Sequence, residues 1–163
     1  MKPGAFACSP RILGERRGAL VEVDSETGEV RIEKLWIVDD VGTMINPALV
    51  EGQIIGGTIM GFGGVMLEQL RYDDRGNLLT TTLQDYQLPN FLSAPPVEIE
   101  HIETPSPITP LGTKGVGEAG CIGTQAAIMA AVEDALSPLG VKVMSTPLTP
   151  WHVLELIETS QSV

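Results

Sequence analysis

The sequence has few aromatic residues, few basic residues and few cysteines. Aromatic side chains make up 4% of its 163 residues although 43% of them are hydrophobic, so we expect a core of aliphatic side chains and methionine. Ten basic residues stand against 21 acidic ones, which gives a formal net charge of −11. This excess of acid argues against nucleic acid and against an anionic membrane surface as partners.

The cysteines and the hydrophobic runs exclude further classes. Cys8 and Cys121 form no metal-ligand spacing with each other or with the two histidines, so we predict no metal held by protein side chains. The longest uncharged run, residues 52–67, is shorter than the roughly 20 residues of a membrane span. No secretory signal is visible at the N-terminus, and two cysteines are consistent with a reducing compartment. We expect no membrane span and a cytoplasmic location.

The pattern of elements predicts an α+β fold, with an irregular tail over residues 1–17 and one domain over residues 18–163. Antiparallel hairpins are expected from strands at 19–23 and 30–38 and from strands at 70–72 and 78–83. Further strands are expected at 97–103, which alternates apolar and polar residues, and at 141–144. Helices are expected from Pro47 to about Leu70, from Gly123 to Leu136, and from Pro150 to about Thr159, packed on the hairpins.

The first of these helices is rich in glycine. Asn46 is its expected N-cap and Pro47 its first residue. Six glycines fall inside it, at positions 52, 56, 57, 61, 63 and 64. Each costs roughly 1 kcal/mol relative to alanine, so the helix persists only if glycine is needed there. Spacings of four residues permit the close approach either of another helix or of a ligand, and the sequence leaves both open.

Glu118 is the candidate catalytic residue. It lies in the segment Gly112-Thr113-Lys114-Gly115-Val116-Gly117-Glu118-Ala119-Gly120, after a proline-spaced loop and before an alanine-rich helix. A carboxylate among glycines, which allow close backbone approach, is a candidate general base. Two other interpretations exist. The segment spells the dinucleotide fingerprint G-x-G-x-x-G, although prolines rather than a buried strand precede it, and Glu118 also suits a helix N-terminus.

Several blocks occur in a distinctive order and spacing. They are Val21-Glu22-Val23-Asp24 with Glu26-Thr27-Gly28, Val38-Asp39-Asp40-Val41-Gly42, Ile45-Asn46-Pro47, Glu51-Gly52-Gln53 with Gly56-Gly57, Asp85-Tyr86 with Leu88-Pro89, Glu103-Thr104-Pro105-Ser106-Pro107, and Leu111 to Gly120. Together they resemble the C-terminal part of the molybdenum-cofactor-binding large subunit of the xanthine dehydrogenase, aldehyde oxidase and carbon monoxide dehydrogenase family. The resemblance covers roughly residues 19–154.

The resemblance implies a molybdenum hydroxylase, an oxidoreductase that oxidises an aldehyde or an N-heterocycle with oxygen derived from water. It implies molybdenum-molybdopterin as cofactor, with the cytosine dinucleotide form as one option, and Glu118 as the base that takes a proton from a hydroxyl on the metal. It places the cofactor against Met60, Gly61, Lys114, Gly115, Val116 and Gly117. Iron–sulfur clusters and FAD on partner subunits would then carry the electrons away from the oxidised small-molecule substrate.

The sequence departs from the family in two respects. The family's large subunit is several times longer, so a partner segment or subunit would supply the rest of the molybdopterin site, and we expect no activity without it. Many relatives carry glutamine where Met60 stands, and a thioether cannot donate the hydrogen bonds of an amide. A non-catalytic structural remnant of such a subunit and a standalone acidic ligand-binding domain remain the alternatives.

Overall fold

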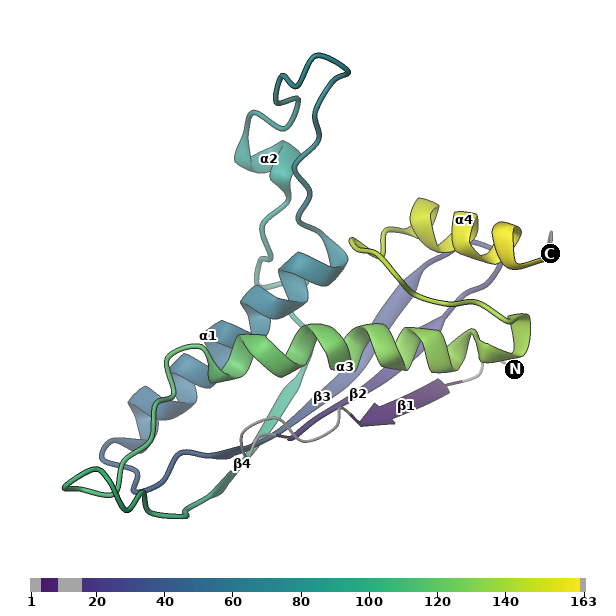
Figure 1. The fold of residues 1–163 in the computed structure, drawn as a ribbon. Helices are drawn as coiled ribbons and strands as arrows, with labels where there is room; N and C mark the ends of the chain where they lie inside the picture. Colours follow the sequence, from purple (N-terminus) through teal and green to yellow (C-terminus); the bar gives the residue numbers. More distant parts are fainter. Residues whose placement is uncertain (1–3, 9–15, 162–163) are drawn as a thin grey trace.

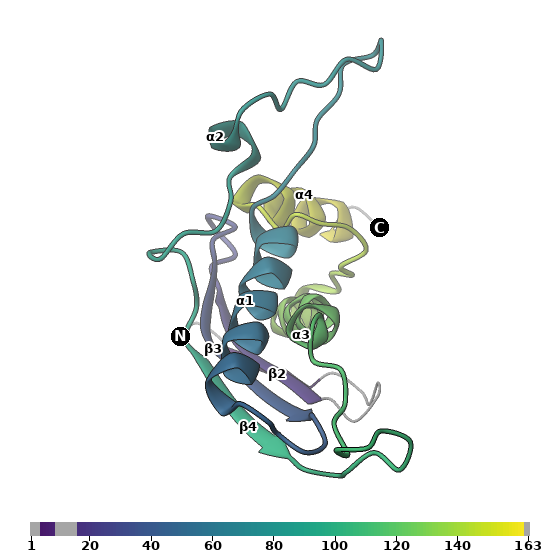
Figure 2. The same cartoon turned by 90° about the vertical axis from the view of Figure 1, so that its left-hand side faces the viewer.

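The fold is a sheet covered on one face by two long helices (Figures 1 and 2). A computed structural model of the chain describes residues 4–8 and 16–161. The sheet has four strands in the order β1-β2-β3-β4, with bounds β1 Gly4–Cys8, β2 Arg16–Val23, β3 Val30–Asp40 and β4 Val97–Ile102. The helices are α1 Pro47–Met66, α2 Leu83–Tyr86, α3 Ala119–Ala135, the short 3₁₀ helix η1 Ser137–Leu139, and α4 Pro150–Gln161. The chain is therefore an α+β protein.

The sheet mixes antiparallel and parallel pairs. Strands β2 and β3 form the first predicted hairpin, and β1 pairs antiparallel with the outer side of β2. The expectation of an irregular stretch before residue 18 is wrong for residues 4–8, which form β1, and β2 already begins at Arg16. Strand β4 lies in the predicted place but pairs parallel with β3, with Ile37 opposite Ile99. The parallel pairing follows from the long connection through α1 that separates the two strands.

Three predicted strands, at 70–72, 78–83 and 141–144, are absent from the structure. The predicted pairing of 70–72 with 78–83 is reduced to one bridge between Tyr72 and Leu78, and Leu83 begins helix α2. A capping box explains this start, because the Thr82 hydroxyl accepts from the Asp85 amide while the Asp85 carboxylate accepts from the Thr82 amide. Residues 141–144 alternate buried and exposed side chains without joining the sheet. Alternation of apolar and polar residues indicates that one side of a segment is buried, but it does not show that the segment pairs with another strand.

The helices begin and end close to their predicted positions. Helix α1 starts at Pro47, and its N-cap Asn46 accepts a hydrogen bond from the Leu49 amide at 3.2 Å, as predicted. It ends at Met66 rather than near Leu70. Helix α3 starts at Ala119, closer to Glu118 than the predicted start at Gly123.

Helices α1 and α3 pack together through glycines. A Cβ at Gly57 would lie 3.0 Å from the Cys121 amide nitrogen, and one at Gly61 would lie 3.0 Å from the Cys121 carbonyl oxygen. On α3, a Cβ at Gly120 would lie 2.2 Å from the Ile54 carbonyl oxygen. These glycines therefore serve helix packing, whereas Gly52 and Gly56 have open space where a side chain would stand.

The core lies between these helices and the sheet. It is mostly aliphatic, as the composition predicts, and its buried members are Ala19, Val21, Val23, Ile32, Leu35, Phe62, Val65, Ala127, Ile128, Ala131, Val132, Ala135, Leu136, Val141, Val143, Leu148, Val153 and Ile157. Among the described residues, α1 is long and apolar enough to cross a membrane by length and composition alone. A helix that packs inside a protein meets the same criterion, and α1 does pack closely on α3.

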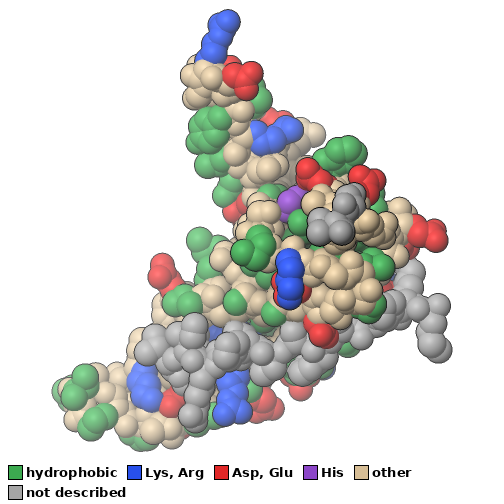
Figure 3. All heavy atoms as spheres, turned by 45° about the vertical axis from the view of Figure 1, so that its right-hand side comes forward, with side chains coloured by type: hydrophobic (Ala, Val, Ile, Leu, Met, Phe, Trp, Pro, Cys, Tyr) green, Lys and Arg blue, Asp and Glu red, His purple; other side chains and the backbone are tan. Residues whose placement is uncertain are grey.

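Residues 67–96, named here the arm, project from the body between α1 and β4 and include α2 (Figures 1 and 3). Several of its large apolar side chains are exposed: Leu70, Tyr72, Leu78, Leu79, Leu83, Leu88, Phe91 and Leu92. Phe91 and Leu92 are 95% and 93% exposed. Apolar surface of this extent is typical of a region that contacts other protein.

Candidate active site

Glu118 lies at the junction between the loop that follows β4 and the first turn of α3. Its carbonyl oxygen accepts a hydrogen bond from the Cys121 amide at 3.0 Å, so its backbone begins the helix. Its side chain is exposed and makes no capping hydrogen bond within the described residues. The carboxylate is therefore available to an incoming group. Strand β4 ends at Ile102, so no strand immediately precedes the glycines as a dinucleotide site requires.

The loop before Glu118 is fixed around Gly112. The Gly112 carbonyl oxygen accepts hydrogen bonds from the amides of Thr43 at 3.0 Å and Ser106 at 2.9 Å. Gly112 has a φ of +72°, and a Cβ there would lie 2.8 Å from the Thr43 hydroxyl oxygen. Only glycine suits both constraints, so the glycine at this position shapes the loop.

Lys114 contacts the end of strand β3. Its ammonium nitrogen lies 2.8 Å from a carboxylate oxygen of Asp40, whose other oxygen accepts from the amides of Thr104 at 3.0 Å and Gly42 at 3.1 Å. The hydrogen bond from Lys114 is the largest cause that holds the pKa of Asp40 well below its usual range, and the two amides add to it. The Lys114 ammonium therefore binds the loop to β3, which is a different role from the predicted contact with a cofactor.

The segment from Gly115 to Gly117 presents open backbone. Apart from the adjoining residues, no atom in the described part of the chain lies within 4 Å of the position that a Cβ would take on either of these glycines. Val116 between them is half-buried. The side-chain amide nitrogen Nε2 of Gln53, on α1, lies 3.4 Å from the Gly117 carbonyl oxygen. This backbone is therefore open to the direct approach of a ligand.

Two predicted cofactor contacts, Met60 and Gly61, lie on α1 and differ in exposure. Met60 is 66% exposed and open to a ligand. Gly61 is buried against the Cys121 carbonyl oxygen, so its backbone is already in contact with α3. Cys121 itself is partly buried, and burial together with the nearby charge of Glu118 raises the pKa of its thiol. A thiol with a raised pKa is a poor nucleophile, in line with a packing role.

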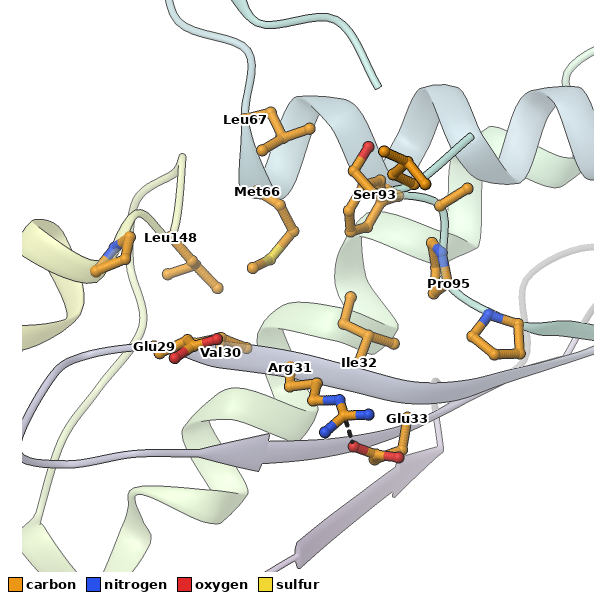
Figure 4. A pocket seen from close by; sticks show the side chains of 15 residues that line it. Glu29, Val30, Arg31, Ile32, Glu33, Met66, Leu67, Ser93, Pro95 and Leu148 are labelled. Carbon is orange, nitrogen blue, oxygen red and sulfur yellow. Dashed lines mark ion pairs between the residues drawn. The ribbon is translucent and has the colours of Figure 1, made fainter. Parts of the chain in front are cut away.

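Two of the cavities formed by the described residues lie along α1. One of about 290 Å³ borders the Lys114–Val116 segment and is walled by Val41, Thr43, Met44, Ile45, Asn46, Leu49, Val50, Gln53 and Thr113. The other, of about 410 Å³, lies at the far end of α1 between β3 and the base of the arm (Figure 4). It contains none of the predicted site residues. Over residues 4–8 and 16–161 there is no group of three or more His, Cys, Asp or Glu side chains arranged to hold a metal.

The sequence patterns did not predict a buried ion pair, Arg17–Asp39, that lies beside Glu118. An Nη1 atom of Arg17 lies 2.5 Å from Oδ1 of Asp39, and Nη2 of Arg17 donates to the Ala119 carbonyl oxygen at 2.6 Å. The signal was present in strand β3, where Asp39 is in phase with the buried Leu35 and Ile37. Strand periodicity alone therefore places Asp39 on the buried side of the sheet.

Comparison with known proteins relates the chain to molybdenum enzymes. Residues 17–95 match the family profile of the molybdopterin cofactor-binding domain. The chain is 51% identical over 135 residues to the large subunit of nicotine 6-hydroxylase from Paenarthrobacter nicotinovorans, a match that covers 83% of the chain and 16% of that subunit. It is 42% identical over 134 residues to the carbon monoxide dehydrogenase large chain of Hydrogenophaga pseudoflava, which covers 82% of the chain and 17% of the relative.

Solved structures agree with this assignment. The quinoline 2-oxidoreductase of Pseudomonas putida 86 superposes with a TM-score of 0.85 at 46% identity, over 88% of the chain and 18% of that protein. A Cu,Mo-containing CO dehydrogenase superposes with a TM-score of 0.86 at 33% identity, over 91% of the chain and 19% of that protein. The chain spans 16% and 17% of the length of the two curated relatives. It therefore belongs to the family of molybdenum-cofactor-binding large subunits and corresponds to one segment of such a subunit.

Proposed function

We propose that this chain forms part of the active site of a molybdenum hydroxylase that oxidises an aldehyde or an N-heterocycle with water-derived oxygen. The observation that carries the proposal is the placement of Glu118. Its carboxylate is exposed and free of a capping role, it follows a loop fixed by Gly112 and by the Lys114–Asp40 pair, and it stands beside open glycine backbone. Family membership supplies the cofactor that such a base would serve.

The described residues fit a molybdopterin cofactor. Its polar groups need backbone donors and room, and the backbone of Gly115 and Gly117 offers both because no described residue occupies the space beside them. Val116 and the exposed Met60 would contribute apolar contact, and the backbone of Lys114 continues the same surface. When bound, the cofactor supplies the acceptor for the two electrons that leave the substrate. The cytosine dinucleotide form is proposed as one option.

Glu118 acts as a general base in this proposal. Hydroxylation of a carbon by water releases two protons and two electrons, and the attacking oxygen is a stronger nucleophile once its proton has been removed. The Glu118 carboxylate accepts that proton on one of its oxygens and later passes it to solvent. A base placed for one proton transfer contributes about 10²–10⁴-fold to the rate.

The apolar surface supports a role inside a larger assembly. Helix α1 exposes Leu49, Ile55 and Met60 on the side that α3 does not cover. We propose that the remaining molybdopterin-binding segment or subunit covers this side of α1 and the arm. Iron–sulfur and flavin subunits are proposed as the electron-accepting partners, with a cytoplasmic location.

Glu118→Gln in the holoenzyme that contains this chain tests the proposal. The amide keeps the size of the side chain but cannot accept the proton, so turnover per bound molybdenum should fall by at least about 10²-fold. Molybdenum content should remain near that of the unaltered enzyme. Asp134→Asn, an exposed carboxylate towards the far end of α3, is the matched control and should change turnover little. Near-normal turnover of Glu118→Gln would make this residue an ordinary charge at a helix terminus and refute the proposal.

A further inference from the structure

We propose that the buried Arg17–Asp39 ion pair is the positioning device that fixes Glu118. The inference rests on the proposed role of Glu118 and assigns a function to two residues outside the candidate cofactor surface. Arg17 belongs to β2 and Asp39 to β3, so the pair links two neighbouring strands. The same guanidinium also reaches the residue that follows Glu118.

The contacts run in a short series from the sheet to the base. Asp39 Oδ1 accepts from Nη1 of Arg17 at 2.5 Å, and Nη2 of Arg17 donates at 2.6 Å to the carbonyl oxygen of Ala119. Arg17 and Asp39 are 2% and 1% exposed, so both bonds form away from water. A planar guanidinium with several fixed donors can hold two acceptors at once, which the ammonium of a lysine cannot reproduce with the same geometry.

The first turn of α3 is in close contact with neighbouring groups on two sides. On one side, a Cβ at Gly123 would lie 2.8 Å from Cγ of Arg17, so the arginine stem passes directly over this glycine. On the other side, the α-carbon of Gly120 packs against the backbone of α1 at Ile54. The turn is thus held between the arginine and α1. Since Glu118 is the residue that begins this turn, its position follows from both contacts.

Stability alone does not account for the pair. Two buried charges lose their hydration, and replacing such a pair by apolar side chains of similar volume is often neutral or stabilising. The second carboxylate oxygen of Asp39 is buried without a hydrogen-bond partner in the described part of the chain, which adds to the cost. The pair therefore costs free energy on burial, and its arginine donates a hydrogen bond to the residue next to the candidate base. Positioning of Glu118 explains why such a pair is present.

The test replaces the pair in the holoenzyme by an apolar one, Arg17→Met with Asp39→Leu. Thermal stability and molybdenum content should stay close to those of the unaltered enzyme, because no charge is left unpaired. Turnover should fall by about 10²-fold with little change in KM, since a shift of about 1 Å in a catalytic group has that effect. Amide hydrogen exchange should accelerate in residues 118–124 but not in the second half of α3. Arg17→Lys should lie between the double variant and the unaltered enzyme in both readouts.

The outcomes separate this inference from the proposed function. Unchanged amide exchange in residues 118–124 of both the double variant and Arg17→Lys would overturn the positioning role, whatever the activity. Normal turnover of both variants, alongside an inactive Glu118→Gln, would also overturn it. Faster exchange together with a fully active Glu118→Gln would support the anchoring of α3 and refute Glu118 as the base. If the double variant yields no holoenzyme, the result for Arg17→Lys decides in the same way.

Discussion

Alanine at Gly120 should destabilise the chain, whereas alanine at Gly52 should stabilise it. Both glycines lie in helices, so helix propensity favours alanine at each by up to about 1 kcal/mol. Their surroundings differ. A Cβ at Gly120 would lie 2.2 Å from the Ile54 carbonyl oxygen and 2.9 Å from the Thr58 amide nitrogen, whereas a Cβ at Gly52 meets no atom of residues 4–8 and 16–161 within 4 Å.

The expected loss of stability in Gly120→Ala follows from the distance between the added Cβ and the Ile54 carbonyl oxygen. A carbon in contact with a carbonyl oxygen lies about 3.3 Å away, so α1 and α3 must separate by about 1 Å to admit the methyl group. The clashing atoms belong to the backbone, which cannot rotate aside as a side chain can. Overpacking of this kind costs about 1–3 kcal/mol, and with propensity in the opposite direction we expect a net loss of roughly 2 kcal/mol for Gly120→Ala. Gly52→Ala should gain roughly 0.5–1 kcal/mol.

Urea unfolding of the chain, followed by the fluorescence of Trp36 and Trp151, measures both changes in the free energy of unfolding. Trp36 reports on β3 and Trp151 on α4, so coincident transitions establish that the chain unfolds as one unit. A Gly120→Ala variant as stable as the unaltered chain would refute the close α1–α3 contact. A destabilised Gly52→Ala variant would show that the open side of α1 is occupied in solution.

Three further outcomes are expected. Because the pKa of Asp40 is lowered in the folded chain, its contribution to stability is complete above the unfolded pKa of about 4 and is lost as the pH falls below that value. Asp40→Asn should therefore lower the Tm at pH 7 and have progressively less effect in acid. A decrease in Tm that does not depend on pH would contradict this. The chain alone should bind a dye specific for apolar surface, and serine at both Phe91 and Leu92 should reduce the signal, whereas a chain that binds no dye would speak against an exposed arm. Expressed alone with cofactor biosynthesis intact, the chain should retain far less than one molybdenum per molecule, and a stoichiometric content would show that no partner is needed.

Local signals predicted the start of α1 and the first hairpin well, although the second predicted hairpin is reduced to the bridge between Tyr72 and Leu78. Asn46 and Pro47 specify the start of α1 because a side-chain cap and a fixed φ act on the adjacent residues alone. The β2–β3 hairpin was predictable for the same reason, since its turn joins strands that are neighbours in sequence. The openness of the backbone around Gly115 and Gly117 also agrees with the expectation from their composition.

Pairings between distant residues could not be predicted in this way. The parallel partner of β3 and the neighbours of Gly57 and Gly61 depend on where distant segments meet, and residue types alone do not specify that. The contacts of Arg17 are the clearest case, because its two acceptors belong to β3 and to α3. The role of Glu118 came from resemblance to a family and remains a proposal.

The parallel pairing of β3 and β4 also sets an order of events during synthesis. Its partners, such as Leu35 and Val97, are about 60 residues apart, so a long loop must close before the ladder forms. The β2–β3 hairpin and α1 consist of residues that leave the ribosome earlier and interact locally. Strand β4, the loop after it and the first turn of α3 emerge later, and Arg17 meets Ala119 only at that stage. The contact that anchors the turn beginning at the candidate base can therefore form only after the residues of β2, β3 and α1 have been synthesised.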